Sequence, residues 1–204
     1  MKKIIWLLLW FPFALFSQEQ NAVPGSLSKG TFLIDGAAQF GFSSSRTKYI
    51  RENATHINEP ETKYFLQGGM GYFPADKFAL GVNMHLSNIY AEKGGWLLLA
   101  GPFMRIYFPS RSVYFFFQTG IYFGTQRISV NLYGEAPRAY YPFLFNFEGA
   151  FGLSMPLNDY VHFELTGGYG AYSEMLDRKD HSYDYSYGIW GLKFGFSLLI
   201  PHGK

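Results

Sequence analysis

The sequence predicts an all-β fold, a transmembrane antiparallel up-and-down β-barrel of about eight strands. Apolar residues alternate with small or polar ones along many segments, which is the pattern of strands with one apolar face. Aromatic residues make up 21% of the chain and charged residues only 16%, against about 25% charged in soluble domains. The clearest segment is Gly101–Thr125, where two alternating runs flank a polar turn at 109–112. It predicts a β-hairpin whose strands are long enough to cross a bilayer when tilted.

The N-terminus indicates a secretory signal peptide at residues 1–17. Lys2 and Lys3 precede the apolar run Ile4–Phe16, and we expect cleavage between Ser17 and Gln18. A membrane anchor is the alternative, but the run is short for a membrane span and Pro12 interrupts it. Residues 18–29 are then expected to form a flexible periplasmic leader, and residues 30–204 to form the barrel domain.

Charge and cysteine content narrow the function. The chain has 17 basic and 15 acidic residues, so removing Lys2 and Lys3 leaves 15 of each. A neutral mature chain offers no basic surface for nucleic acid. The absence of cysteine excludes a lipoprotein acylation site, a disulfide framework and thiolate metal sites.

The alternating segments divide the chain into eight strands. We expect them at about Gly30–Ser43, Lys63–Phe73, Phe78–Ile89, Trp96–Phe108, Val113–Thr125, Pro142–Met155, Tyr160–Ser173 and Tyr185–Leu199. In the first strand, Asp35 alternates with Phe32 and Ile34, so the phenylalanine face is the lipid face and the aspartate points into the lumen.

The same alternation assigns the inward and outward faces of the second to fifth strands. In the second strand Leu66 points outward and Gln67 inward, and in the third strand His85 lies on the inward face. Arg105 in the fourth strand and Gln118 in the fifth also fall on the inward faces, opposite rows of apolar side chains.

The last three strands each place a charged residue inward. Glu148 alternates with phenylalanines in the sixth strand, His162 and Glu164 share one face of the seventh, and Lys193 faces inward in the eighth. The opposite faces are aromatic and aliphatic, as expected for side chains that contact lipid.

The connections between strands are of two kinds. Those after the second, fourth and sixth strands are short, whereas the segments 44–62, 126–141 and 174–184 are long and charged. The connection after the third strand is a short exception. Short periplasmic turns opposite longer external loops are typical of such barrels, so both termini are expected in the periplasm.

These features resemble the small, about eight-stranded OmpA-like/porin-like outer-membrane β-barrel proteins of Bacteroidetes type. The resemblance rests on Leu-Phe-Ser-Gln at 15–18, Gly-Pro-Phe-Met-Arg-Ile-Tyr-Phe at 101–108 and Gly-Leu-Lys-Phe-Gly-Phe at 191–196. It implies the cell outer membrane as location, contact with outer-membrane lipid and lipopolysaccharide, and insertion by the barrel-assembly machinery. That machinery usually reads a terminal aromatic residue, but here Phe196 is followed by Ser-Leu-Leu-Ile-Pro-His-Gly-Lys, so the assembly signal is displaced.

A barrel of about eight strands has an interior that side chains can fill. The inward charges should therefore pair with one another, because isolated charges there are costly. We expect a lumen ion-pair network of Asp35, Arg105, Glu148, Glu164 and Lys193, joined by His85 and His162. The specific hypothesis places Arg105 at the centre, between Glu148 and Glu164. Such a network can act as a structural plug, and the alternative is a narrow gated channel.

An outer-membrane lipid acyl hydrolase is the enzymatic alternative. His85-Leu86-Ser87 resembles the His-x-Ser of outer-membrane lipid A deacylases, in which histidine is the base for a serine nucleophile. In that family the pair lies late in the chain and an acidic residue follows about a dozen positions on, where this chain has Leu99. Parity also points both side chains into the lumen, so we expect no enzyme.

Cofactor and metal sites are not expected. His162 and Glu164 share a face but no third ligand is set by spacing, and Asp177, Asp180 and Asp184 lack calcium-loop spacing.

A soluble lipocalin-like barrel would need charges on its outer face, and the apolar face here has almost none. The long loops carry tyrosine and mixed charge, which suits a surface protein or glycan partner. We therefore expect a structural or surface-binding role.

Overall fold

The computed structural model describes residues 27–49, 54–57, 61–89, 95–110, 113–130, 138–141, 143–175 and 183–201. Within these ranges the strands are β1 (Phe32–Tyr49), β2 (Ala54–Ile57), β3 (Glu61–Ala75), β4 (Phe78–Ile89), β5 (Gly95–Pro109), β6 (Tyr114–Val130), β7 (Arg138–Tyr140), β8 (Phe143–Pro156), β9 (Val161–Met175) and β10 (Tyr183–Ile200). The described residues include no helix with the length and hydropathy to span a membrane.

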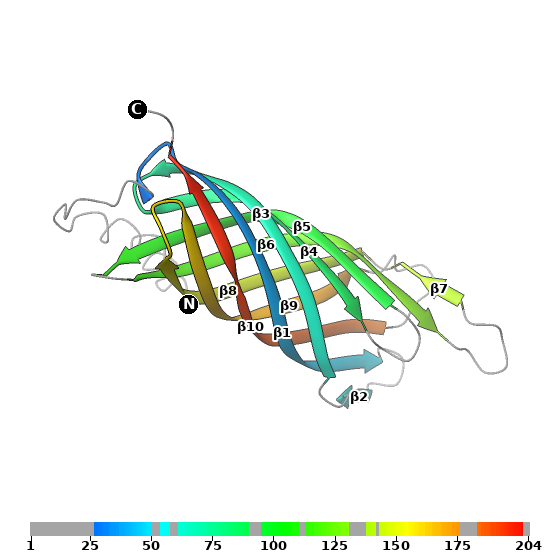
Figure 1. The fold of residues 1–204 in the computed structure, drawn as a ribbon. Coiled ribbons are helices and arrows are strands. Elements are labelled where there is room, and N and C mark those ends of the chain that lie inside the picture. Colours follow the sequence, from blue (N-terminus) through cyan, green and yellow to red (C-terminus); the bar gives the residue numbers. More distant parts are fainter. Residues whose placement is uncertain are drawn as a thin grey trace, which may run out of the picture.

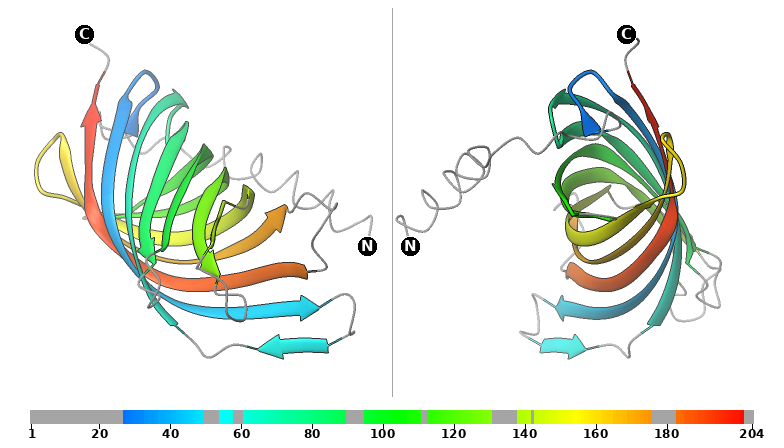
Figure 2. Two further views of the ribbon diagram at one scale, coloured as in Figure 1. Left: turned by 90° about the vertical axis from the view of Figure 1, so that its right-hand side faces the viewer. Right: turned by 60° about the vertical axis from the view of Figure 1, so that its left-hand side comes forward.

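Long antiparallel strands close into a barrel. The order of the wall is β1, β3, β4, β5, β6, β8, β9 and β10, and β10 pairs back onto β1 from Phe32–Ile200 to Tyr49–Tyr183. Figures 1 and 2 show these strands winding steeply around a common axis. The expected up-and-down barrel of eight strands is therefore confirmed.

The strands extend further than their apolar pattern indicates. β1 continues to Tyr49 and pairs with β2, and β6 continues to Val130 and pairs with β7. These parts of the segments 44–62 and 126–141 were expected to be loops, and that assignment was wrong for them. Backbone hydrogen bonds continue the ladder whatever the hydropathy of the side chains. The third expected loop, 174–184, is also strand at its ends, because 174–175 belong to β9 and 183–184 to β10. Residues 50–53, 58–60, 131–137 and 176–182 lie outside the described residues.

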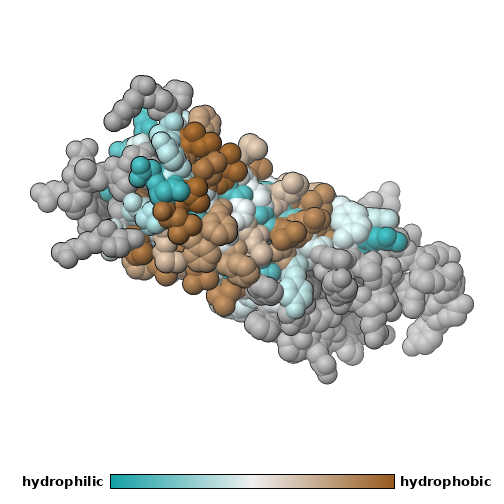
Figure 3. All heavy atoms as spheres, in the orientation of Figure 1, coloured by the Kyte–Doolittle hydropathy of each residue, from teal (hydrophilic) through white to brown (hydrophobic). Residues whose placement is uncertain are grey.

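Burial alternates along the strands as the parity predicts. Leu33 is fully buried while Ile34 is 48% exposed, and Phe151 on β8 is 72% exposed beside the buried Ala150. Figure 3 shows hydrophobic side chains gathered over the strand region of the face in view. This outward-facing apolar surface is the reverse of a lipocalin-like barrel, which keeps its apolar side chains inside.

The two ends of the barrel differ. We call the turn end the one with the β3–β4, β5–β6 and β8–β9 connections, and the loop end the opposite one. The β3–β4 turn is tight, with Lys77 in the left-handed region at φ 64°. Each end holds a buried apolar cluster. The turn-end cluster comprises Leu27, Leu33, Phe73, Ala79, Phe103, Tyr107, Phe116 and Leu199. The loop-end cluster comprises Phe65, Leu97, Leu99, Tyr122, Leu144, Tyr172 and Ile189.

Residues 27–29 pack against the turn end. Leu27 is fully buried in the turn-end cluster, and its carbonyl accepts a 2.8 Å hydrogen bond from the amide of Lys77. The amide of Lys29 donates to Asp76 Oδ1 at 2.7 Å. These residues were expected to belong to a flexible leader. Burial of the Leu27 side chain in this cluster removes apolar surface from water.

Candidate functional site in the barrel interior

A layer of polar side chains separates the two apolar clusters. Each comes from a different strand, and none is more than 8% exposed. This central polar layer comprises Asp35, Gln67, Arg105, Gln118, Glu148, Glu164 and Lys193. The inward parity of each strand brings them together, because successive side chains point to opposite sides of the wall.

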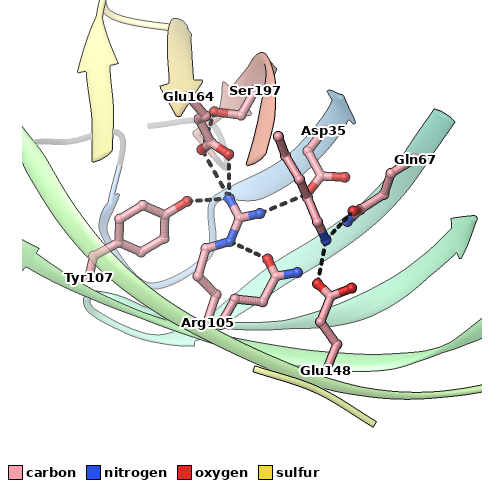
Figure 4. Close-up of polar contacts among 9 residues, drawn as sticks. Asp35, Gln67, Arg105, Tyr107, Glu148, Glu164 and Ser197 are labelled. Atoms are coloured by element: carbon pink, nitrogen blue, oxygen red, sulfur yellow. Dashed lines mark hydrogen bonds and ion pairs between the residues drawn. The ribbon is translucent and has the colours of Figure 1, made fainter. Parts of the chain in front are cut away.

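Arg105 is the hub of the part of the layer nearer the turn end (Figure 4). Its Nη2 donates to Asp35 Oδ2 at 2.9 Å, and its Nη1 donates to both oxygens of Glu164 at 2.9 and 3.0 Å. Nε donates to Gln118 Oε1 at 2.8 Å, and Nη1 also reaches the Tyr107 hydroxyl at 3.0 Å. The planar guanidinium suits this arrangement, because its fork of donors can meet several oxygens at once.

Lys193 forms a second, separate ion pair nearer the loop end. Its Nζ donates to Glu148 Oε1 and, at 2.8 Å, to Gln67 Oε1. Glu148 therefore pairs with Lys193 and not with Arg105, which corrects the expected arrangement. The reason is height along the barrel axis. Glu148 lies toward the loop-end half of β8, whereas Glu164 lies near the turn-end start of β9, on the level of Arg105.

The two interior histidines do not join these ion pairs. His85 is fully buried beside Tyr122, with ring centroids 4.3 Å apart, and neither ring nitrogen has a hydrogen-bond partner among the described residues. His162 Nδ1 lies 2.9 Å from Ser154 Oγ, and its ring stacks on Tyr114 near the turn end. The structure thus places both histidines inside the barrel but in other surroundings.

The geometry gives no support to the His-x-Ser hydrolase hypothesis. Ser87 Oγ donates to the carbonyl of Tyr64 at 2.8 Å, and His85 makes no hydrogen bond to it. Both side chains are buried in the lumen, away from the lipid face that an acyl substrate would occupy.

Metal ligands are not gathered in the parts of the chain that the structure describes. No group there of three or more His, Cys, Asp or Glu side chains is placed to hold a metal ion. Of the pair on β9, His162 contacts Ser154 and Glu164 is held by Arg105. Asp177 and Asp180 lie outside the described residues.

Little free space remains in the central polar layer. A cavity of about 20 Å³ lies among its side chains, lined by Asp35, Gln67, Arg105 and Lys193 with their neighbours. That volume admits roughly one water molecule. Together with the apolar clusters on either side, the layer closes the interior over the residues described.

Sequence reasoning missed several hydrogen-bond partners of the ion pairs. Gln67 and Gln118 were assigned to the inward face without a role, and Ser197 donates to Glu164 Oε1 at 2.8 Å. These residues could have been recognised as partners because each is a polar side chain at an inward-facing position, among neighbours that are mostly small or aromatic.

A closed antiparallel barrel with an apolar exterior and a paired ionic layer inside defines the class of small transmembrane β-barrels. The chain is similar in fold to crystal structures of two outer-membrane barrels. Neisserial surface protein A is 13% identical, with a TM-score of 0.50, over 85% of this chain and 100% of that one. OprG from Pseudomonas aeruginosa is 14% identical, with a TM-score of 0.53, over 87% and 99%. No protein-family model matches the sequence, and no curated protein matches it significantly. At these identities the likeness concerns the fold alone.

Proposed function

We propose that this protein is an integral outer-membrane barrel with a closed lumen, serving as a membrane-embedded scaffold that presents its long loops outside the cell. The observation that carries the proposal is the blocked interior. Two apolar clusters and the central polar layer between them leave a cavity of only about 20 Å³.

The outer surface supports the membrane location. Large apolar side chains on every wall strand are exposed, among them Met70 at 69%, Phe151 at 72% and Trp190 at 65%. Such a continuous apolar surface is unfavourable in water, and a hydrocarbon environment removes that cost. The fold likeness to outer-membrane barrels and the signal peptide expected from the sequence agree with this location.

The energetics favour a plug over a gated channel. Opening a path through the layer would require Arg105 to leave Asp35 and Glu164, all within the low-dielectric interior. Breaking a buried ion pair by removing one partner costs about 3–5 kcal/mol, and here one guanidinium holds two carboxylates. The ion pairs therefore reinforce a closure that the two apolar clusters also provide.

The difference between the barrel ends supports an orientation. The turn end has short connections and carries residues 27–29, whereas the segments joining β1 to β3, β6 to β8 and β9 to β10 are long. We place the turn end and both termini in the periplasm, and the loop end outside, where lipopolysaccharide and a surface protein or glycan are the expected partners.

Planar bilayer recording tests the closed lumen. The refolded protein should give no discrete conductance steps, and Arg105→Ala should give none either, because the two apolar clusters remain. A general diffusion porin inserted under the same conditions is the positive control. Discrete steps from the unmodified chain would refute the plug and favour the channel.

Surface labelling tests the orientation. An epitope inserted at residues 131–137 should be reached by antibody on intact cells, whereas the same epitope at residues 156–159 should be reached only after the outer membrane is permeabilised. The reverse pattern would contradict the assignment. Co-purification with the loop segment 131–137 shortened then distinguishes a binding protein, which loses a stoichiometric partner, from an inert scaffold.

A further inference from the structure

A groove lies on the surface of the turn end, where the β8–β9 turn meets the C-terminal end of β10 (Figure 1). Its volume is about 650 Å³, within the range of about 300–1,000 Å³ that small-molecule sites occupy. We call it the seam groove, and it is lined by Asn158, Asp159, Tyr160, Val161, Leu198 and Ile200. One turn and two neighbouring wall strands therefore form it.

The floor of the seam groove is apolar and faces outward. Val161 of β9 and Leu198 of β10 are cross-strand partners. Leu198 is 37% exposed and Ile200 is 42% exposed, and on their other side they pair with the exposed residues Ile34 and Phe32 of β1. Because the floor belongs to the apolar outer surface of the barrel, it suits a hydrocarbon chain and not a polar molecule.

The rim of the seam groove is polar and is fixed by hydrogen bonds to the backbone. Asn158 Oδ1 accepts from the amides of Tyr160 and Val161 at 2.9 and 2.8 Å, which leaves the Nδ2 group of Asn158 as a donor. The carbonyl of Tyr160 accepts from the amide of Leu199 at 2.7 Å, and this bond ties the turn to β10. The Tyr160 side chain is 53% exposed and adds a hydroxyl group.

The charge of the lining has one sign. Asp159 is exposed and makes no ion pair with any residue that the structure describes, and none of the lining residues is basic. A carboxylate at the edge of an apolar floor attracts a cationic head group and repels an anionic one. The groove therefore favours a lipid with an ammonium group over a lipid whose head group carries only phosphate.

We propose that the seam groove binds one phospholipid with a primary ammonium group, such as phosphatidylethanolamine, from the periplasmic leaflet. An acyl chain lies on the apolar floor, and the ammonium group contacts the carboxylate of Asp159. The lipid phosphate accepts hydrogen bonds from Asn158 Nδ2 and the Tyr160 hydroxyl. The leaflet rests on the proposed function, which places the turn end in the periplasm, whereas the preference for an ammonium group rests on the lining alone.

Native mass spectrometry of the refolded protein in detergent micelles tests the preference. The protein is titrated with phosphatidylethanolamine or with phosphatidylglycerol carrying the same palmitoyl and oleoyl chains. The fraction of barrels that hold one lipid is measured at each concentration. We expect the first phosphatidylethanolamine to bind about fivefold more tightly than the first phosphatidylglycerol, which is the upper value for an exposed ion pair.

Three variants assign the preference to the seam groove. Asp159→Asn removes the charge and keeps the size of the side chain, so the two lipids should bind equally. Asp76→Asn is the matched control, because it removes one charge from the β3–β4 turn at the same end of the barrel, outside the lining. It should keep the full preference. Val161→Trp fills the floor and should weaken the binding of both lipids, and heat-modifiable migration checks that each variant is folded.

Equal binding of the two lipids by the unmodified barrel would overturn the proposal, and so would a preference that persists in Asp159→Asn. Loss of the preference in Asp76→Asn as well would also overturn it, because net charge and not the groove would then select the lipid. The orientation fails separately. An epitope at residues 156–159 that antibody reaches on intact cells would refute the periplasmic leaflet and the proposed orientation, whereas the binding measured in micelles does not depend on orientation.

Discussion

Arg105 and Glu164 lie 59 residues apart in the sequence and meet through two hydrogen bonds of 2.9 and 3.0 Å in the barrel interior. Arg105 comes from β5 and Glu164 from β9, which are not neighbours in the wall. The contact therefore spans the lumen and ties opposite sides of the barrel together, with Asp35 of β1 as a third point of attachment.

Replacing Arg105 by methionine should destabilise the folded barrel by about 3–5 kcal/mol, because it leaves Asp35 and Glu164 buried without their cation. The measurement is equilibrium urea unfolding in lipid vesicles. The matched control is Arg127→Met, at an exposed position of β6, for which we expect a change within about 0.5 kcal/mol. Equally small changes for both variants would mean that the ion pairs of Arg105 contribute little to the stability of the folded barrel.

The Lys193–Glu148 pair should show strong coupling. Lys193→Met leaves Glu148 as an unpaired buried charge, and Glu148→Gln leaves Lys193 as an unpaired buried charge. Each substitution should lower the free energy of unfolding by about 3–5 kcal/mol. The double variant should recover most of that loss, since neither charge remains. A double-mutant cycle from urea unfolding measures the coupling. Additive losses would show that the two residues act independently.

Gly195 and Gly36 provide a test of close backbone approach. A Cβ at Gly195 would lie 2.0 Å from the carbonyl oxygen of Gly36, whereas a Cβ at Gly36 meets nothing within 4 Å. Gly195→Ala should therefore cost about 1–3 kcal/mol by overpacking, and Gly36→Ala should be tolerated. The folded fraction on a heat-modifiability gel, followed by urea unfolding, reports both. Similar tolerance at the two positions would contradict the packing described.

The lipid face can be tested with a single charge. Phe151 is 72% exposed on β8, so Phe151→Arg should place a guanidinium in hydrocarbon and cost about 2–4 kcal/mol near the bilayer midplane. Leu157, which is 62% exposed in the β8–β9 turn, gives the control Leu157→Arg, with little expected change. The free energy of unfolding of both variants is measured by urea unfolding in lipid vesicles. A loss at Leu157 that equals the loss at Phe151 would argue against this membrane placement.

Leu27 should contribute to stability although it lies before the first strand. Leu27→Ala removes a fully buried side chain from the turn-end cluster, with an expected cost of about 2–5 kcal/mol. Leu157→Ala, at an exposed site, is the control. No loss at Leu27 would mean that residues 27–29 do not hold the turn end closed in the membrane.

The inward or outward direction of the strand side chains could be predicted from the sequence alternation. Every inward assignment from Asp35 on β1 to Lys193 on β10 agrees with the observed burial, because side chains in a strand alternate with a period of two and only one face can meet lipid. The strand ends were less predictable. The polar stretch 44–49 continues β1 because pairing with β10 satisfies its backbone groups, and side-chain hydropathy carries no record of that pairing.

The sequence by itself determined the fold class, the inward or outward direction of the side chains along the described wall strands, and the kind of groups that fill the lumen there. Only the tertiary structure decided which charges meet. Height along the axis depends on the tilt and stagger of strands in the closed barrel, and these are properties of the whole sheet. That is why Arg105 binds Asp35 and Glu164, Lys193 takes Glu148, and His85 and His162 stand apart, although all seven residues share the same inward face.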